Sequence, residues 1–152
     1  MMDKHITGAM LDAMADLVYT ADEIVFFLPY RTFAIASFQQ NLSISGKKTD
    51  YLCLVPEMLE RSRHLRAQSI VFMDTIDHAE AMDMLDVLSA AKAAGARIIK
   101  PIRGRAPYDR YVDQTIFTFD MMENAPTNIL LTISYFLMLS EVFRKKFIKE
   151  TR

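Results

Sequence analysis

The sequence predicts an α/β fold, a three-layer αβα sandwich in which a five-stranded parallel sheet has helices on both faces. Short apolar runs of strand length alternate with longer segments of helical period along the whole chain. Strands that are apolar throughout are typical of a parallel sheet covered on both sides. No linker, repeat or low-complexity tract interrupts the pattern. The 152 residues are therefore expected to form a single domain, 1–152, with an N-terminal helix over 1–20 and an α/β core and long C-terminal helix over 21–152.

The first half of the chain contains two apolar runs that end at prolines. The run EIVFFL stops near Pro29, and TDYLCLV stops at Pro56. Gly46 follows a helical pattern at the position of a helix C-cap. The predicted elements of this half are a helix over 5–20, a strand over 23–28, a helix over 31–45, a strand over 49–55 and a basic helix over 57–66.

The second half repeats the alternation. Gly95 is predicted to cap one helix, and Pro126 suits the first turn of the last one. The predicted elements are a strand over 69–74, a helix over 79–94, a strand over 96–101, a helical turn over 108–112, a strand over 114–119 and a helix over 126–149.

Composition excludes several broad classes. The net charge of −1 gives no general attraction to nucleic acid or to acidic membranes. No apolar run approaches the roughly 20 residues that span a bilayer, and the N-terminus lacks the layout of a signal peptide. A single cysteine, Cys53, excludes an internal disulfide, suits a cytoplasmic protein and is expected to be an inert core thiol in the middle of a strand.

Three loops are the candidates for a binding site. In open parallel sheets, ligands bind beyond the carboxyl ends of the strands, near the point where the strand order reverses. The corresponding loops are Pro29–Thr32, Asp74–His78 and Ile102–Pro107. A crevice between Thr32 and Arg105 is expected at this edge.

At these loops the chain resembles the SIS (sugar isomerase) domain, most closely the effector domain of RpiR-type transcription regulators. Three segments carry the resemblance: ADEIVFFLPYRTFAIASFQQNLSISGKKT, SIVFMDTIDHAEAMDMLDVLSAAKAAGARII and RAPYDRYVDQTIF, in which Asp113 matches an aspartate before the last strand. The resemblance implies a flavodoxin-like strand order, a homodimer and a sugar-phosphate ligand. It also implies that DNA is contacted only through a helix-turn-helix segment that would precede this chain.

The chemical motifs of the family are altered here. The glycine-rich first loop, which ends in serine in the family, becomes Leu28-Pro29-Tyr30-Arg31-Thr32, in which Thr32 keeps a hydroxyl at the end. The serine-rich second loop falls on Ile76–Glu80 or, with a small shift, on Asp74-Thr75, and Ala106 replaces a serine before the last strand. Arginine guanidinium groups could replace the backbone phosphate cradle. The predicted ligand residues are Tyr30, Arg31, Thr32, Asp74, Thr75, His78, Arg103 and Arg105.

Neither a cofactor nor a metal is predicted. The acidic stretch of Asp74, Asp77, His78, Glu80 and Asp83 could hold a divalent cation, but carboxylates before a helix more often cap it. A likeness to phosphate-accepting receiver domains, through Asp74 and Lys100, is rejected. Their acidic pair after the first strand is absent, and the interval between the two residues is too short.

Three functions follow from these patterns. The leading hypothesis is a domain that senses a small anionic ligand, such as a sugar phosphate, within a transcription regulator. The alternatives are an aldose–ketose sugar-phosphate isomerase with His78 or Glu80 as its base, and a ligand-free dimerisation scaffold. The terminal helix carries more apolar residues than one sheet face needs, which predicts a homodimer.

Overall fold

The computed structural model describes residues 8–75, 78–102, 106–117 and 125–151. Side chains are described throughout these ranges except at 78–81, 102, 117 and 125–129. Within them, no helix is long and apolar enough to cross a membrane.

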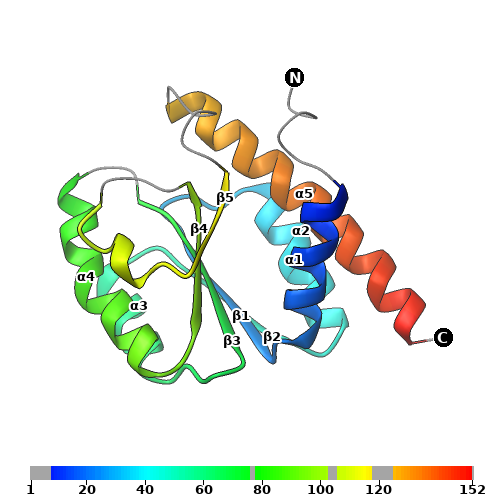
Figure 1. The fold of residues 1–152 in the computed structure, drawn as a ribbon, viewed down its shortest axis with the longest axis horizontal. Helices are drawn as coiled ribbons and strands as arrows, with labels where there is room; N and C mark the ends of the chain where they lie inside the picture. The colour runs from blue at the N-terminus through cyan, green and yellow to red at the C-terminus, as the bar shows by residue number, and fades with distance from the viewer. Residues whose placement is uncertain (1–7, 76–77, 103–105, 118–124, 152) are drawn as a thin grey trace.

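A five-stranded sheet lies at the centre of the molecule (Figure 1), and all its described pairings are parallel. Its order is β2-β1-β3-β4-β5, so the strand order reverses between β1 and β3. This confirms the predicted α/β sheet and its flavodoxin-like order. The strands are β1 (Glu23–Phe27), β2 (Lys48–Leu52), β3 (Ser69–Met73), β4 (Arg97–Ile102) and β5 (Gln114–Phe117).

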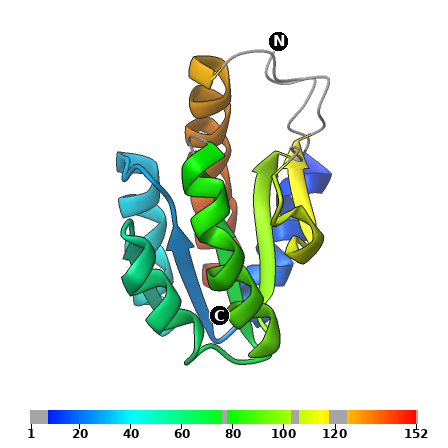
Figure 2. The ribbon, with the colours of Figure 1, turned by 90° about the vertical axis from the view of Figure 1, so that its left-hand side faces the viewer.

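Helices cover both faces of the sheet. One face carries α1 (Gly8–Thr20), α2 (Phe33–Ile44) and α5 (Ala125–Glu150), with α5 packed against both of the others. The other face carries α3 (Val55–Ser62), α4 (His78–Ala93) and the short 3-10 helix η2 (Asp109–Tyr111). Figures 1 and 2 show the three layers, with α5 beginning beyond the carboxyl ends of the strands and overhanging that edge.

Aromatic packing dominates the core beneath α2 and α5. Phe26 stacks on Phe72 at 5.6 Å between ring centroids, and the Phe136 ring meets Phe72 edge-on at 5.2 Å. Phe38 contacts the same group, and all four side chains are fully buried. Because β1 and β3 are buried at every position, these strands are apolar on both faces. The continuous apolar runs of the sequence have this origin.

Two predicted helix ends are confirmed at glycines. Gly46 and Gly95 both have positive φ, +86° and +92°, which glycine adopts without steric cost. At each one the chain makes the hydrogen bonds of a helix C-cap, from Lys47 N to Leu42 O and from Ala96 N to Ala91 O. A side chain at position 95 would also meet the backbone of Ala67 at 3.4 Å.

The region around Cys53 differs from its prediction. β2 ends at Leu52, and α3 already begins at Val55, with Pro56 in its first turn. Pro56 therefore starts a helix rather than stopping a strand. Cys53 lies between the two elements and is exposed, so the expectation of a buried mid-strand thiol is wrong. The physical reason is that β2 is an edge strand whose residues are all at least partly exposed.

The amino-terminal edge of the sheet holds a closed ionic network. The buried Glu23 carboxylate accepts hydrogen bonds from Arg61 at 2.6 Å and from the Ser69 hydroxyl at 2.5 Å. Arg61 also pairs with Asp50 at 2.8 Å. Burial raises the pKa of Glu23, but the bonds from Ser69 and Arg61 outweigh it and hold this pKa below its ordinary value. The group therefore stays ionised and paired.

Candidate functional site

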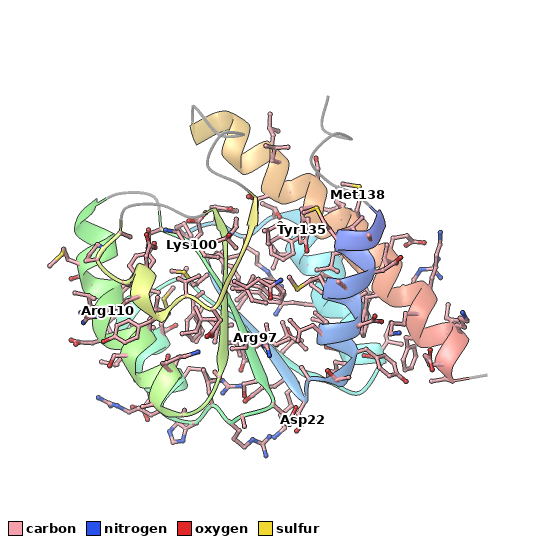
Figure 3. All side chains as sticks on the ribbon, in the orientation of Figure 1. Asp22, Arg97, Lys100, Arg110, Tyr135 and Met138 are labelled. Carbon is pink, nitrogen blue, oxygen red and sulfur yellow. The ribbon has the colours of Figure 1, made fainter. Side chains whose placement is uncertain are left out.

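The carboxyl-terminal edge of the sheet brings together the loop after β1 and the loop after β3. These flank the reversal of strand order, where ligands bind in folds of this type. The backbone N–H of Asp74 donates to the carbonyl of Phe27, which extends the β1–β3 pairing into the loops. Figure 3 places Lys100 of β4 toward this edge and Asp22 at the opposite one.

Thr32 begins helix α2 as its N-cap. The Thr32 hydroxyl oxygen accepts a hydrogen bond from Ile35 N at 3.3 Å, which satisfies one of the free N–H groups of the first turn. The structure thus puts the one aliphatic hydroxyl of the first loop at a helix start. Its hydrogen can still be donated, because a hydroxyl both accepts and donates.

Arg31, the other polar candidate of the first loop, lies on the β2 side. Its guanidinium is 5.7 Å from the centre of the Tyr51 ring and donates to Gln39 at 3.2 Å. Tyr51 in turn donates to the carbonyl of Leu28 at 3.1 Å, which fixes the end of β1. Arg31 is exposed and stands at the rim near β2 rather than at the β1–β3 junction.

Tyr30 and Asp74 occupy the junction itself. The Tyr30 hydroxyl is buried and lies beside Thr132 of α5. Burial and the nearby Asp74 carboxylate raise the pKa of Tyr30, so the phenol stays neutral. Asp74 is half-buried, and one of its carboxylate oxygens accepts the N–H of Thr75 at 2.8 Å.

Thr75 is joined to the loop before β5. Its hydroxyl forms a 2.6 Å hydrogen bond with the hydroxyl of Tyr108, a side chain that is fully buried. The Lys100 ammonium lies 4.7 Å from the centre of the Tyr108 ring and pairs with Asp109 at 3.2 Å. Asp109 also accepts the N–H of Ala106 at 3.0 Å, so it ties this loop to β4.

Lys100 keeps its charge although it is only 6% exposed. Burial alone would lower the pKa of Lys100, but Tyr108 and Asp109 outweigh it and hold the pKa above its ordinary value. The Tyr108 pKa is raised by burial and lowered in part by Thr75 and Lys100. The centre of this edge therefore contains a buried cation next to a neutral phenol.

Several predicted residues lie outside the described part of the chain. This holds for Arg103 and Arg105 and for the side chain of His78, so the expected crevice between Thr32 and Arg105 is described only on its Thr32 side. Asp77 is outside it as well, as is the side chain of Glu80. Within the described residues, no three His, Cys, Asp or Glu side chains are grouped so that they could hold a metal ion.

Lys100 and Tyr108 were missing from the residues predicted to bind the ligand. One signal was present for Lys100. After its first residue, the strand RIIKPI is apolar apart from this lysine. Tyr108 had no such signal, because a tyrosine before a helical turn is common on protein surfaces. Its contact with Thr75 depends on strand order, which brings residues 33 positions apart together.

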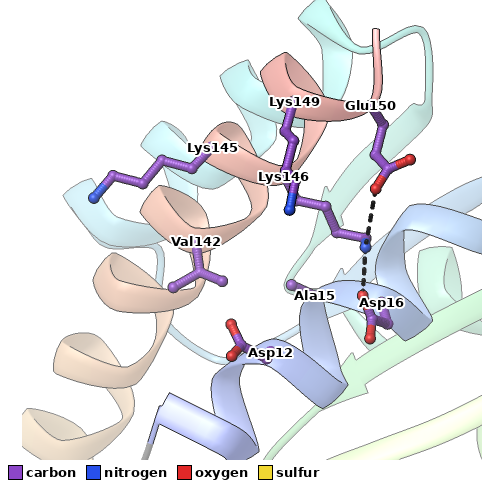
Figure 4. Close-up of a pocket in the computed structure, with 8 residues that line it drawn as sticks. All are labelled: Asp12, Ala15, Asp16, Val142, Lys145, Lys146, Lys149 and Glu150. Carbon is purple, nitrogen blue, oxygen red and sulfur yellow. Dashed lines mark ion pairs between the residues drawn. The ribbon is translucent and has the colours of Figure 1, made fainter. Parts of the chain in front are cut away.

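A separate hollow of about 470 Å³ lies between α1 and the second half of α5 (Figure 4). It contains Lys145, Lys149 and Lys146, the last of which bridges Asp16 at 2.5 Å and Glu150 at 3.9 Å. Three cations face three carboxylates there, because Asp12 lines the hollow too. This balance gives the hollow no net preference for an anion.

Fold and edge geometry define the class of this molecule as a parallel α/β protein with a polar junction where the strand order reverses. Comparison with solved structures sharpens that class: the fold is that of the SIS domain. No protein-family model and no curated protein sequence matches the chain.

Three solved structures illustrate the likeness. The Vibrio vulnificus NanR protein complexed with ManNAc-6P has a TM-score of 0.66 at 11% identity, over 99% of this chain and 61% of that one. The sugar isomerase domain of an RpiR transcription factor from Sphaerobacter thermophilus gives 0.58 at 14%, over 99% and 89%. A Methanococcus jannaschii protein, with an inferred function of 3-hexulose-6-phosphate isomerase, gives 0.56 at 13%, over 94% and 78%.

Proposed function

We propose that this chain is a ligand-sensing domain that binds a small sugar phosphate at the carboxyl-terminal edge of its sheet. The observation that carries the proposal is the pair of threonine hydroxyls, Thr32 and Thr75, on either side of the β1–β3 junction. The solved neighbours support it, since they include regulators and a protein complexed with ManNAc-6P. The proposal includes that the chain forms a single domain to which the C-terminal helix belongs.

The chemistry of the junction suits a ligand with both donors and acceptors. The Asp74 carboxylate accepts hydrogen bonds and matches sugar hydroxyl groups, whereas the hydroxyls of Thr32 and Thr75 match an anionic group. A sugar phosphate offers both kinds of group on one small molecule. Arg31, His78, Arg103 and Arg105 remain proposed ligand residues that would complete the anion-binding side.

Thermal unfolding with matched pairs of sugars tests this proposal. ManNAc-6P and glucose 6-phosphate should raise the melting temperature, and the same sugars without phosphate should raise it much less. A Lys145→Ala/Lys149→Ala variant should respond as the wild type does, because these lysines line the separate hollow between α1 and α5. No response to any phosphorylated sugar, or a response lost in the lysine variant, would refute the proposed site.

We propose further that the domain is a homodimer formed through α5. Leu130 and Leu137 are 62% and 40% exposed although they are large and apolar. Their spacing of seven residues puts them on one face of the helix, an apolar surface that a second copy would bury. Light scattering should show a dimer for the wild type and a monomer for Leu130→Asp/Leu137→Asp. A wild-type monomer would refute this part of the proposal.

The net charge of −1 gives the domain no general attraction for DNA. A regulator that contains this domain would therefore read DNA through a different segment.

Sensing without catalysis also has a direct test. Incubation with glucose 6-phosphate, followed by NMR, should show no ketose product, and its appearance would favour the isomerase alternative.

A further inference from the structure

A chain of contacts runs from Asp109 through Lys100 and Tyr108 to Thr75, and it ends in a hydrogen bond whose direction follows from burial and charge. Lys100 can only donate, because an ammonium group has no lone pair. It donates to Asp109 at 3.2 Å and lies 4.7 Å from the centre of the Tyr108 ring. The ammonium charge of Lys100 therefore lies beside the Tyr108 phenol.

Among the described residues, one acceptor lies within hydrogen-bond distance of the Tyr108 hydroxyl, and this is the Thr75 oxygen. Tyr108 is fully buried, and a buried hydroxyl hydrogen without an acceptor costs free energy. Its neighbour at 2.6 Å is the Thr75 oxygen. The positive charge of the nearby Lys100 also repels the hydrogen of the Tyr108 hydroxyl, which favours its orientation toward Thr75. Tyr108 is thus the donor of this bond, and Thr75 is the acceptor.

Thr75 is left with its own hydroxyl hydrogen to donate. Within the described residues, Tyr108 is the one partner of this hydroxyl, and Thr75 is half-buried at the carboxyl edge. We propose that Asp109, Lys100 and Tyr108 act as a relay that holds Thr75 as a fixed donor, so that the ligand places an acceptor, a phosphate oxygen, against it. This inference rests on the proposed function and adds Lys100 and Tyr108 as positioning residues.

Asp109 gives the relay its rigidity. One carboxylate oxygen of Asp109 accepts a hydrogen bond from Lys100, and the other accepts one from the N–H of Ala106. The loop before η2 is therefore held to β4. The buried ammonium also adds a positive potential behind Thr75, which strengthens a bond from Thr75 to an anion. Neutral acceptors, such as sugar hydroxyl oxygens, gain less from both effects.

A double-mutant cycle on the full chain tests the relay, with glucose 6-phosphate and inorganic phosphate as probes in calorimetry. Thr75→Val keeps the shape of the side chain but removes the donor, and should weaken binding by about tenfold or more. Thr75→Ser keeps the donor and should bind nearly as the wild type. Tyr108→Phe alone should weaken binding about fivefold. In the Thr75→Val background, Tyr108→Phe should have no further effect, because it acts through Thr75.

Lys100→Met and a matched opposite-edge variant, Thr20→Val, complete the set. Lys100→Met should weaken phosphate binding by more than its lowered melting temperature accounts for. Thr20→Val should change neither phosphate binding nor the melting temperature. Additive effects of Thr75→Val and Tyr108→Phe, or folded Tyr108→Phe and Lys100→Met variants that bind as the wild type, would overturn the relay and leave the proposed function standing. A wild type that binds neither probe would overturn both.

Discussion

The buried polar groups at the two edges of the sheet are paired in different ways. At the amino-terminal edge, Glu23, Arg61, Ser69 and Asp50 bond to one another, and the buried carboxylate has all its strong partners within the fold. At the carboxyl-terminal edge, Lys100 lies against the Tyr108 ring, and the Tyr108 hydroxyl bonds to the half-buried hydroxyl of Thr75. A closed network stabilises the fold, whereas an open one leaves a group for a ligand. Perturbing each edge should therefore affect different measurements.

The largest expected effect comes from removing a partner of the closed network. Arg61→Met leaves the Glu23 carboxylate buried without its counterion, and should lower the free energy of unfolding by about 3 kcal/mol in urea titration. Its response to glucose 6-phosphate should remain, because the opposite edge is untouched. Arg63→Met at the C-cap of the same helix, where the arginine is exposed, should change stability little. Equal effects of the two variants would contradict the closed network.

The same network predicts how stability depends on pH. The pKa of Glu23 is lowered in the fold, so its contribution is present above the unfolded pKa near 4.5 and is lost as pH falls through the lower folded value. The difference in unfolding free energy between wild type and Glu23→Gln should shrink over this acid range. A difference that stays constant from neutral pH down to this range would refute the assignment.

A change at the carboxyl edge should affect binding and spare stability. Thr32→Asn and Thr32→Asp both keep an N-cap for α2, and their unfolding free energies should agree within about 1 kcal/mol. The aspartate adds a negative charge beside the ligand, so glucose 6-phosphate should bind it about tenfold more weakly than it binds the asparagine variant. Equal affinities would place the phosphate away from Thr32.

The smallest effect is expected at Cys53, which follows edge strand β2. Because Cys53 is exposed, its thiol should react with a thiol reagent in the native protein at the rate of a small-molecule thiol. Cys53→Ser should leave the melting temperature nearly unchanged. Labelling that requires unfolding would show that the end of β2 is covered.

Periodicity was sufficient to predict the sheet, because β1 and β3 are buried on both faces and their sequences are apolar throughout. The same reasoning failed at Cys53, because an apolar run does not reveal that its strand lies at an edge and ends early. Thr32 was predicted from its place in the first loop. Lys100 and Tyr108 could not be, since their meeting with Thr75 depends on which strands become neighbours.

The most direct test of the open carboxyl edge is an NMR titration of the backbone amides with glucose 6-phosphate. Shifts should concentrate at Thr32, Thr75 and Lys100 and leave Glu23 and Arg61 at the opposite edge unchanged. Shifts that cluster instead around Lys145 and Lys149 between α1 and α5, or no shifts at saturating ligand, would contradict it.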